Sequence, residues 1–227
     1  MLHSDAGSNT VLWRTPEEEN YHFHNWSPNG RFFLYSHWGT GWPVATTPTD
    51  LWVWDVETRT GHRWVPDAFG AAWPPAGDRV AVLLTGTPHL DSAGRVMDTD
   101  FAVGEPLTAT LAVLNWPDER LVAQTPAGYW PRLVDDDEAW QEFARRQPVW
   151  SPDGRWLAYR GPDDELWVMR ADGSELRRIT QGLLRRAVAG VLSPVARRLT
   201  VAWSADSRYL ALAIAGHIWV LRGPWPP

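Results

Sequence analysis

The side chains of this sequence best suited to chemistry are three imidazoles near its beginning. His22 and His24 are separated by one residue, so a β-strand would carry both on one face, and His37 would end the next strand. Imidazoles placed together can ligate a metal ion. Histidines beside a turn can also be merely solvated. We therefore predict no bound metal or cofactor, and name these three histidines as the candidate ligands if a metal binds.

No recognised catalytic motif accompanies these histidines. The sequence has neither the Gly-x-Ser-x-Gly turn of a serine hydrolase nor the His-Glu-x-x-His helix of a zinc protease. It contains no cysteine, and its 21 basic residues are all arginine, so thiol catalysis and lysine Schiff bases are excluded. We predict that the chain is not an enzyme and has no catalytic residues.

Tryptophan is the other residue type that could bind a ligand, because the chain has 17 of them. Five fall in predicted insertions or tails, where the repeats described below do not require burial. Exposed rings there would anchor a protein partner or stack on sugar rings. The alternative is that each insertion folds its tryptophan underneath itself. The predicted partner-binding residues are Trp38, Trp42, Trp130, Trp140 and Trp225.

The elements that must position these side chains come from a repeat built on four other tryptophans. Each is followed by a tight turn, an arginine and an alternating strand, and the four are Trp26, Trp73, Trp150 and Trp203. In the third copy, Ser-Pro-Asp-Gly at 151–154 supplies a proline that presets φ, an aspartate that can bond its own backbone, and a glycine that accepts the left-handed conformation. The turn therefore joins two antiparallel strands, and the four tryptophans are predicted core residues.

A second pattern, an apolar strand, recurs downstream of each copy, and its Trp52, Trp167 and Trp219 are also predicted core residues. In the first three copies a polar turn and another strand follow, so each unit has four strands. The fourth copy stops early, and the strand-like residues 10–14 could complete it and remove an exposed sheet edge. The predicted units span about 22–65, 70–125, 148–180 and 199–222.

The pattern Trp-Ser-Pro-Asp-Gly-Arg, followed by Leu-Trp-Val and an Asp-Gly turn, resembles the repeat of bacterial TolB-like β-propellers, relatives of the Trp-Asp-repeat propellers. The resemblance covers most of the chain and is closest over 148–180. It implies an all-β fold, a single β-propeller-like domain over residues 1–227 with about four blades of four antiparallel strands. Propellers of this family usually have six or more blades. A small closed ring, degenerate further blades and an open array completed by a partner are all compatible with the sequence.

Spacing between the repeat tryptophans shows where the chain has been extended. The steps are 47, 77 and 53 residues, whereas a four-stranded blade needs roughly 40 to 45. The excess forms loops, where binding residues concentrate on a rigid scaffold. We predict one short helix over 139–146. The acids at 135–138 are interpreted as its N-terminal cap rather than as a metal site. A second helix could form within 182–191.

Charge and hydropathy limit the partners and the location. The net charge of −6 argues against binding to nucleic acid. The longest apolar stretch is too short to span a bilayer, and the first residues lack the positive region and apolar core of a signal peptide. The sequence therefore favours the cytoplasm, although the family resemblance implies that a periplasmic location is possible.

Repeats without catalytic groups, together with tryptophans in the insertions, favour a non-enzymatic interaction or scaffold module of a larger bacterial assembly. Its partner would be another protein or a second copy of the chain. The alternative is an oligosaccharide-active lyase or hydrolase, or a carbohydrate-binding propeller, with loop tryptophans stacked on sugar. A third hypothesis is a purely structural, incomplete propeller that becomes whole only by association.

Overall fold

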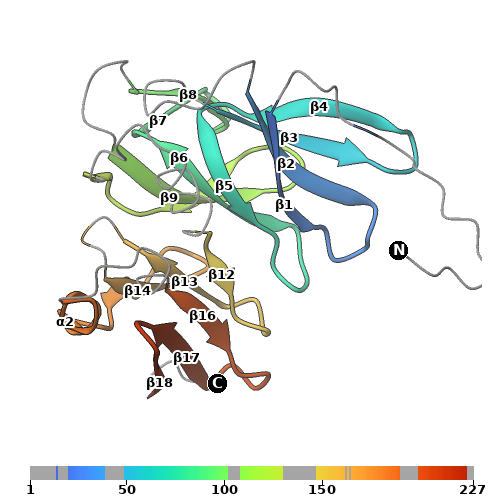
Figure 1. Ribbon diagram of the computed structural model, residues 1–227. Coiled ribbons are helices and arrows are strands. Elements are labelled where there is room, and N and C mark those ends of the chain that lie inside the picture. Colours follow the sequence, from blue (N-terminus) through green and yellow to red (C-terminus); the bar gives the residue numbers. More distant parts are fainter. Residues whose placement is uncertain are drawn as a thin grey trace, which may run out of the picture.

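The computed structural model describes residues 14, 20–38, 49–101, 108–129, 147–161, 163, 165–189 and 199–223. Nearly all of the regular structure in this part of the chain is β-strand, which confirms the predicted all-β class. The strands form four main antiparallel sheets that follow one another along the chain, from upper right to bottom in Figure 1.

Each main sheet takes its strands from one sequence repeat. Sheet 1 contains β1 (Asn20–Trp26), β2 (Phe32–Trp38), β3 (Asp50–Asp55) and β4 (Thr60–Val65). Sheet 2 contains β5 (Ala68–Ala72), β6 (Arg79–Thr85), β9 (Thr108–Asn115) and β10 (Leu121–Gln124), with β11 (Gly128–Tyr129) also paired to β9. Sheet 3 contains β12 (Val149–Trp150), β13 (Trp156–Arg160), β14 (Leu166–Arg170) and β15 (Arg177–Arg178). Sheet 4 contains β16 (Thr200–Trp203), β17 (Tyr209–Ile214) and β18 (His217–Arg222).

Two further elements lie in the predicted insertions. The hairpin of β7 (Pro88–Leu90) and β8 (Val96–Thr99) is inserted between β6 and β9. The short helix α2 (Leu183–Ala187) confirms the helix expected within 182–191. The helix predicted over 139–146 lies outside the described residues. So does the strand predicted over 10–14, except for Arg14, which is exposed and belongs to no strand.

The turns that open sheets 1, 3 and 4 share one hydrogen-bonding pattern. In sheet 3 the Ser151 hydroxyl donates to the Asp153 carboxylate over 2.5 Å and accepts from the Trp156 amide over 2.9 Å. The corresponding serines of the other two turns do the same. In sheet 4 the residue at the left-handed position is Ser207, with φ of +60°. Its hydroxyl accepts from the Asp153 amide over 3.2 Å, so this turn is fastened to the preceding one.

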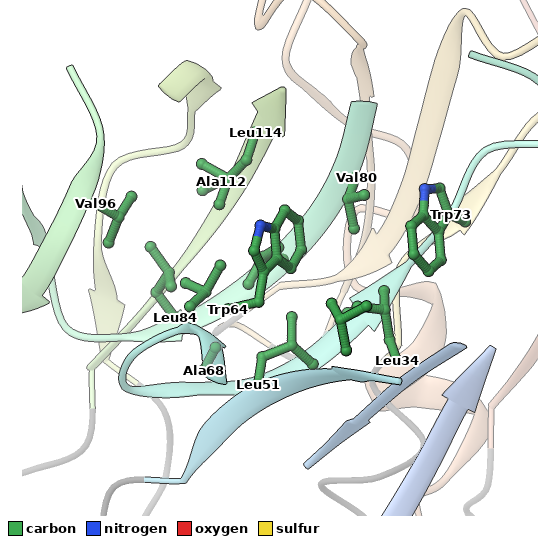
Figure 2. Close-up of a cluster of buried hydrophobic side chains, with 14 residues drawn as sticks. Leu34, Leu51, Trp64, Ala68, Trp73, Val80, Leu84, Val96, Ala112 and Leu114 are labelled. Atoms are coloured by element: carbon green, nitrogen blue, oxygen red, sulfur yellow. The ribbon is translucent and has the colours of Figure 1, made fainter. Parts of the chain in front are cut away.

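Hydrophobic cores fill the spaces between successive sheets. Between sheets 1 and 2, Leu34 and Leu51 pack towards Val80, Leu84 and Leu114, as Figure 2 shows. Between sheets 2 and 3, alanines and larger apolar side chains of sheet 2 pack on large side chains of sheet 3. Sheet 2 contributes Phe69, Ala72, Ala81, Leu83, Ala109, Leu111, Val113 and Ala123, and sheet 3 contributes Trp150, Leu157, Tyr159 and Met169. Between sheets 3 and 4, Trp156 packs with Leu210, Leu212 and Leu184 of α2.

Two repeat tryptophans are fastened to the preceding sheet by a buried or half-buried hydrogen bond. The Trp150 indole N–H donates to the Ala72 carbonyl over 2.8 Å, and the Trp203 indole N–H donates to the Val149 carbonyl over 3.0 Å. In both cases the acceptor is the residue just before the repeat tryptophan of the preceding sheet. These bonds connect the first strands of the sheets. We call the row of first strands β1, β5, β12 and β16 the inner edge.

Sheets 1 and 4 stand at the two ends of the array, so the described sheets form an open arrangement (Figure 1). Trp73 and Trp150 are buried as predicted, and Trp203 is half-buried. The prediction that Trp26 is a core residue is wrong, because its side chain is 49% exposed. The other repeat tryptophans are shielded from solvent by packing against the preceding sheet. In the described part of the chain no sheet precedes sheet 1, so no such sheet shields Trp26.

The described residues contain no helix that is long and apolar enough to cross a membrane.

Candidate functional site

The polar side chains of the inner edge begin with two histidines of β1. His22 and His24 lie on the same face, as the sequence predicts, with ring centroids 5.0 Å apart and planes at 73°. His24 Nε2 is 2.7 Å from the hydroxyl of Ser36, which lies on the neighbouring strand β2. Ser36 is fully buried. His22 and His24 are both half-buried, and the Nδ1 atom of His24 is shielded from solvent.

Gln147 lies against the inner edge and connects sheets 2 and 3. Its side-chain oxygen accepts the amide of Ala71 on β5 over 2.8 Å, which satisfies a backbone donor at the free edge of sheet 2. Gly70 makes room for it, because a Cβ built there would lie 3.1 Å from both side-chain polar atoms of Gln147. Gln147 directly precedes the strands of sheet 3, so this bond ties sheet 3 to sheet 2. Gln147 Nε2 and His24 Nδ1 are buried, and neither has a hydrogen-bond partner among the described residues.

A shallow pocket opens beside Gln147, between sheets 3 and 4. Its polar lining residues are Gln147 and Arg160; Tyr159 also borders it, but the Tyr159 ring packs in the core between sheets 2 and 3. The lining residues are Gln147, Val149, Ala158, Tyr159, Arg160, Leu199 and Val201. The pocket therefore continues the row of polar groups that starts at His22.

Burial keeps both histidines of the inner edge neutral. The pKa of His24 falls to about 3, first because burial removes water from the ring and then because His22 is close; the Gln147 side chain opposes these effects. Burial also lowers the pKa of His22 below its usual value, and raises the pKa of the Tyr159 phenol. At neutral pH the inner edge therefore offers imidazoles, an amide and a phenol without charge, with Arg160 as the cation.

The contact between His24 and Ser36 is not a catalytic pair. A serine nucleophile needs a base whose pKa lies near the working pH and a path for the substrate. Ser36 is fully buried, and the His24 pKa of about 3 is too low for an efficient base at neutral pH. This pair is therefore a structural contact between β1 and β2.

His37 does not join the other two histidines, so the expected cluster of three is wrong. It pairs with Tyr21 across β1 and β2 and stacks on that ring at 4.7 Å, on the opposite face of sheet 1 from His22 and His24. Within the described ranges, no group of three or more His, Cys, Asp or Glu side chains could hold a metal ion. Two imidazoles, one of them bonded to Ser36, do not fit a metal.

The five tryptophans predicted to bind a partner are largely beyond the structure described here. Trp38 ends β2, and Trp42, Trp130, Trp140 and Trp225 lie outside the described residues. Sequence reasoning missed Ser36, Gln147 and Arg160. No spacing or motif marks them: Ser36 meets His24 through the pairing of β1 and β2, and Gln147 meets Ala71 of the preceding repeat only when the sheets stack.

No protein-family model and no curated protein matches this sequence. Solved structures with a similar fold include the uncomplexed acylaminoacyl peptidase of Pyrococcus horikoshii, at 12% identity and a TM-score of 0.47; the match covers 92% of this chain and 31% of the peptidase. The β-propeller domain of the Trilobed protease from Pyrococcus furiosus matches at 11% identity and a TM-score of 0.45, covering 93% of this chain and 56% of that one. An oligogalacturonate lyase in complex with manganese matches at 10% identity and a TM-score of 0.40, covering 95% of this chain and 69% of the lyase.

These structures are consistent with the propeller expected from the repeats, since stacked four-stranded sheets are the blades of that fold. The chain spans less than a third of the length of the peptidase. The prediction of a non-enzymatic scaffold is contradicted, because the proteins found are enzymes or a domain of one rather than scaffolds.

Proposed function

We propose that this chain is an oligosaccharide-binding β-propeller and that sugar binds along the inner edge. The observation that carries the proposal is the set of uncharged hydrogen-bonding groups of His22, His24 and Gln147 along the inner edge, beside a pocket that Gln147 also lines. Sugar hydroxyls both donate and accept hydrogen bonds. A neutral imidazole and an amide also do both, so these groups match a polyhydroxylated ligand.

Arg160 gives this site a preference for an acidic sugar. Arg160 lines the pocket between sheets 3 and 4. A guanidinium presents paired donors that fit a carboxylate, and such charge-assisted hydrogen bonds are the strong ones. The favoured ligand is therefore an oligosaccharide that contains uronic acid.

The same proposal treats each main sheet as one blade of a TolB-like propeller. The support is the shared turn chemistry of sheets 1, 3 and 4, and the tryptophan bonds from sheet 3 to sheet 2 and from sheet 4 to sheet 3. In such an array the inner edge borders the central axis. A sugar bound there would contact several blades at once, which agrees with the pocket between sheets 3 and 4.

Calorimetric titration of the chain with a uronic-acid oligosaccharide and with a neutral one of equal length tests this function. We expect the acidic sugar to bind more tightly, and Arg160→Met to weaken it by about tenfold or more, since hydrogen bonds to charged groups contribute about 1.5–3 kcal/mol. The matched control is Arg59→Met, which changes an exposed arginine in the turn between β3 and β4. Absence of binding by both sugars would refute the proposal. Equal effects of the two substitutions would refute the role of Arg160.

A further inference from the structure

The outward face of sheet 4, at the lower end of the array in Figure 1, is apolar and open to solvent. On β18, Trp219 and Leu221 pack towards sheet 3, whereas Ile218 and Val220 between them are 75% and 65% exposed. Large aliphatic side chains gathered on an exposed surface commonly mark a place where a partner binds. We call this surface the end face; its residues are Thr200, Ala202, Tyr209, Ala211, Ala213, Ile218, Val220 and Arg222.

The equivalent positions of the two preceding sheets are buried. Val220 corresponds to Val113 of sheet 2 and to Val168 of sheet 3, because each stands opposite an alanine of the neighbouring strand. Val113 is fully buried and Val168 is 1% exposed, since the next sheet covers both. Leu166 of sheet 3 and Ile218 of sheet 4 differ in the same way. No sheet follows sheet 4 in the part of the chain that the structure describes. The end face therefore has the composition of a surface that another sheet covers.

The end face carries a row of large side chains beside a row of small ones. Its part of β18 holds Ile218, Val220 and Arg222, and its part of β17 holds Ala211 and Ala213. Facing layers pack well when the large side chains of one meet the small side chains of the other. A second copy of the end face supplies both kinds of row. The face is therefore complementary to itself, which is what a two-fold interface between identical chains requires.

We propose that two copies of this chain form a dimer in which the end faces pack on each other about a two-fold axis. The axis runs along the strands, between β17 and β18 and midway between the two sheets. Neighbouring strands are about 4.8 Å apart and facing sheets about 10 Å apart, so rotation about this axis puts β18 of each copy over β17 of the other. Residues paired within one sheet then face each other across the interface. Ile218 packs on Ala213 of the second copy, and Val220 packs on its Ala211.

The same rotation sets Arg222 over Tyr209 of the second copy, because these two residues are also paired in each sheet. The Tyr209 ring is 37% exposed and Arg222 is exposed, so both are available for this contact. A guanidinium above an aromatic ring is attracted to its face. The dimer therefore covers the aliphatic side chains and adds a polar contact at each end of the interface.

Light scattering and sedimentation of the full chain, over a wide range of concentration, test this dimer. We expect a particle of twice the 25.7 kDa chain mass. Ile218→Asp and Val220→Asp each place a carboxylate in the interface and should raise the dissociation constant by about thirtyfold or more, as expected for central interface residues. Both side chains are exposed in one copy, so the variants should fold, and circular dichroism checks this. Met97→Asp is the control, because Met97 on β8 is 57% exposed but lies outside the end face.

Cross-linking identifies the surface that forms the dimer. The chain contains no cysteine, so Ile218→Cys and Ala213→Cys each introduce a single thiol. A short bismaleimide should join the two variants when they are mixed, whereas a mixture of Met97→Cys and Ala213→Cys should stay unjoined. The proposal is wrong if the wild-type chain stays monomeric, if Ile218→Asp does not weaken the dimer, or if the first mixture is not cross-linked. None of these outcomes depends on whether sugar binds at the inner edge.

Discussion

Replacing His24 with glutamine should make the protein less sensitive to acid. In the folded chain His24 is half-buried, its Nδ1 is shielded from solvent, and its Nε2 is bonded to the Ser36 hydroxyl. Its pKa is about 3 when folded, against about 6.5 in an unfolded chain. Between pH 6.5 and pH 3 the His24 imidazole is therefore protonated in the unfolded state and neutral in the folded state. The free energy of unfolding falls as the pH is lowered through this range.

The size of the effect follows from these two pKa values. Each pH unit between them costs about 1.4 kcal/mol of unfolding free energy per histidine. Between pH 7 and pH 5 the wild-type chain should therefore lose about 2 kcal/mol through His24 alone. Glutamine carries a side-chain amide that can occupy the position of Nε2 next to Ser36, and it does not titrate in this range.

Urea denaturation at pH 7 and at pH 5 measures this loss. His24→Gln lowers the stability at pH 7, because packing around the ring changes, but its stability should fall by about 2 kcal/mol less than that of the wild type on going to pH 5. His217→Gln is the control, because His217 on β18 is exposed. If wild type and His24→Gln lose the same free energy between the two pH values, His24 is not a buried neutral histidine and the description of the inner edge is wrong.

Two further substitutions test the packing between and within the sheets. Trp150→Phe removes the indole N–H and leaves the buried Ala72 carbonyl without its donor, which should cost about 1–3 kcal/mol by urea denaturation. Trp26→Phe is the control at an exposed repeat tryptophan and should change stability by less than about 0.5 kcal/mol; equal losses would contradict the proposed role of the bond. Gly61→Ala would place a Cβ 2.7 Å from the Tyr35 hydroxyl oxygen and 3.0 Å from the Trp54 ring, at a cost of about 1–3 kcal/mol in thermal or urea unfolding. Adding Tyr35→Phe should recover part of that loss, and a double variant as unstable as the sum of the two single variants would show that the contact is not the cause.

Most of the fold that could be predicted from the sequence was predicted from the repeat. Proline, aspartate and glycine at 152–154 predict a hairpin turn, and the structure contains it: Asp153 accepts the Arg155 amide, the Gly154 amide donates to the Ser151 carbonyl, and Gly154 adopts a φ of +67°. The same local chemistry explains why the turn of the fourth repeat forms without proline or glycine, since Ser207 adopts the left-handed conformation there. Local residues decide these features, so a local pattern is sufficient to predict them.

The candidate site could not be predicted to the same degree, because strand register decides it. A bulge between Phe23 and Trp26 puts these two residues on one face, away from His24, although simple alternation would place Trp26 with the histidines. His37 falls on the opposite face of sheet 1 from His22 and His24, because it pairs with Tyr21. Gln147 reaches Ala71 across 76 positions of sequence. The spacing of these residues in the sequence does not predict any of the three placements.

The acceptors of the two tryptophan bonds are main-chain carbonyls, and this has a consequence for how such chains diverge. Ala72 and Val149 hold equivalent places yet differ in side chain, because every residue offers the same carbonyl. A copied repeat can therefore dock on its neighbour without any matching mutation at the acceptor, provided that it keeps its own tryptophan. Gene duplication could lengthen the array one unit at a time, while selection on the acceptor positions stays relaxed.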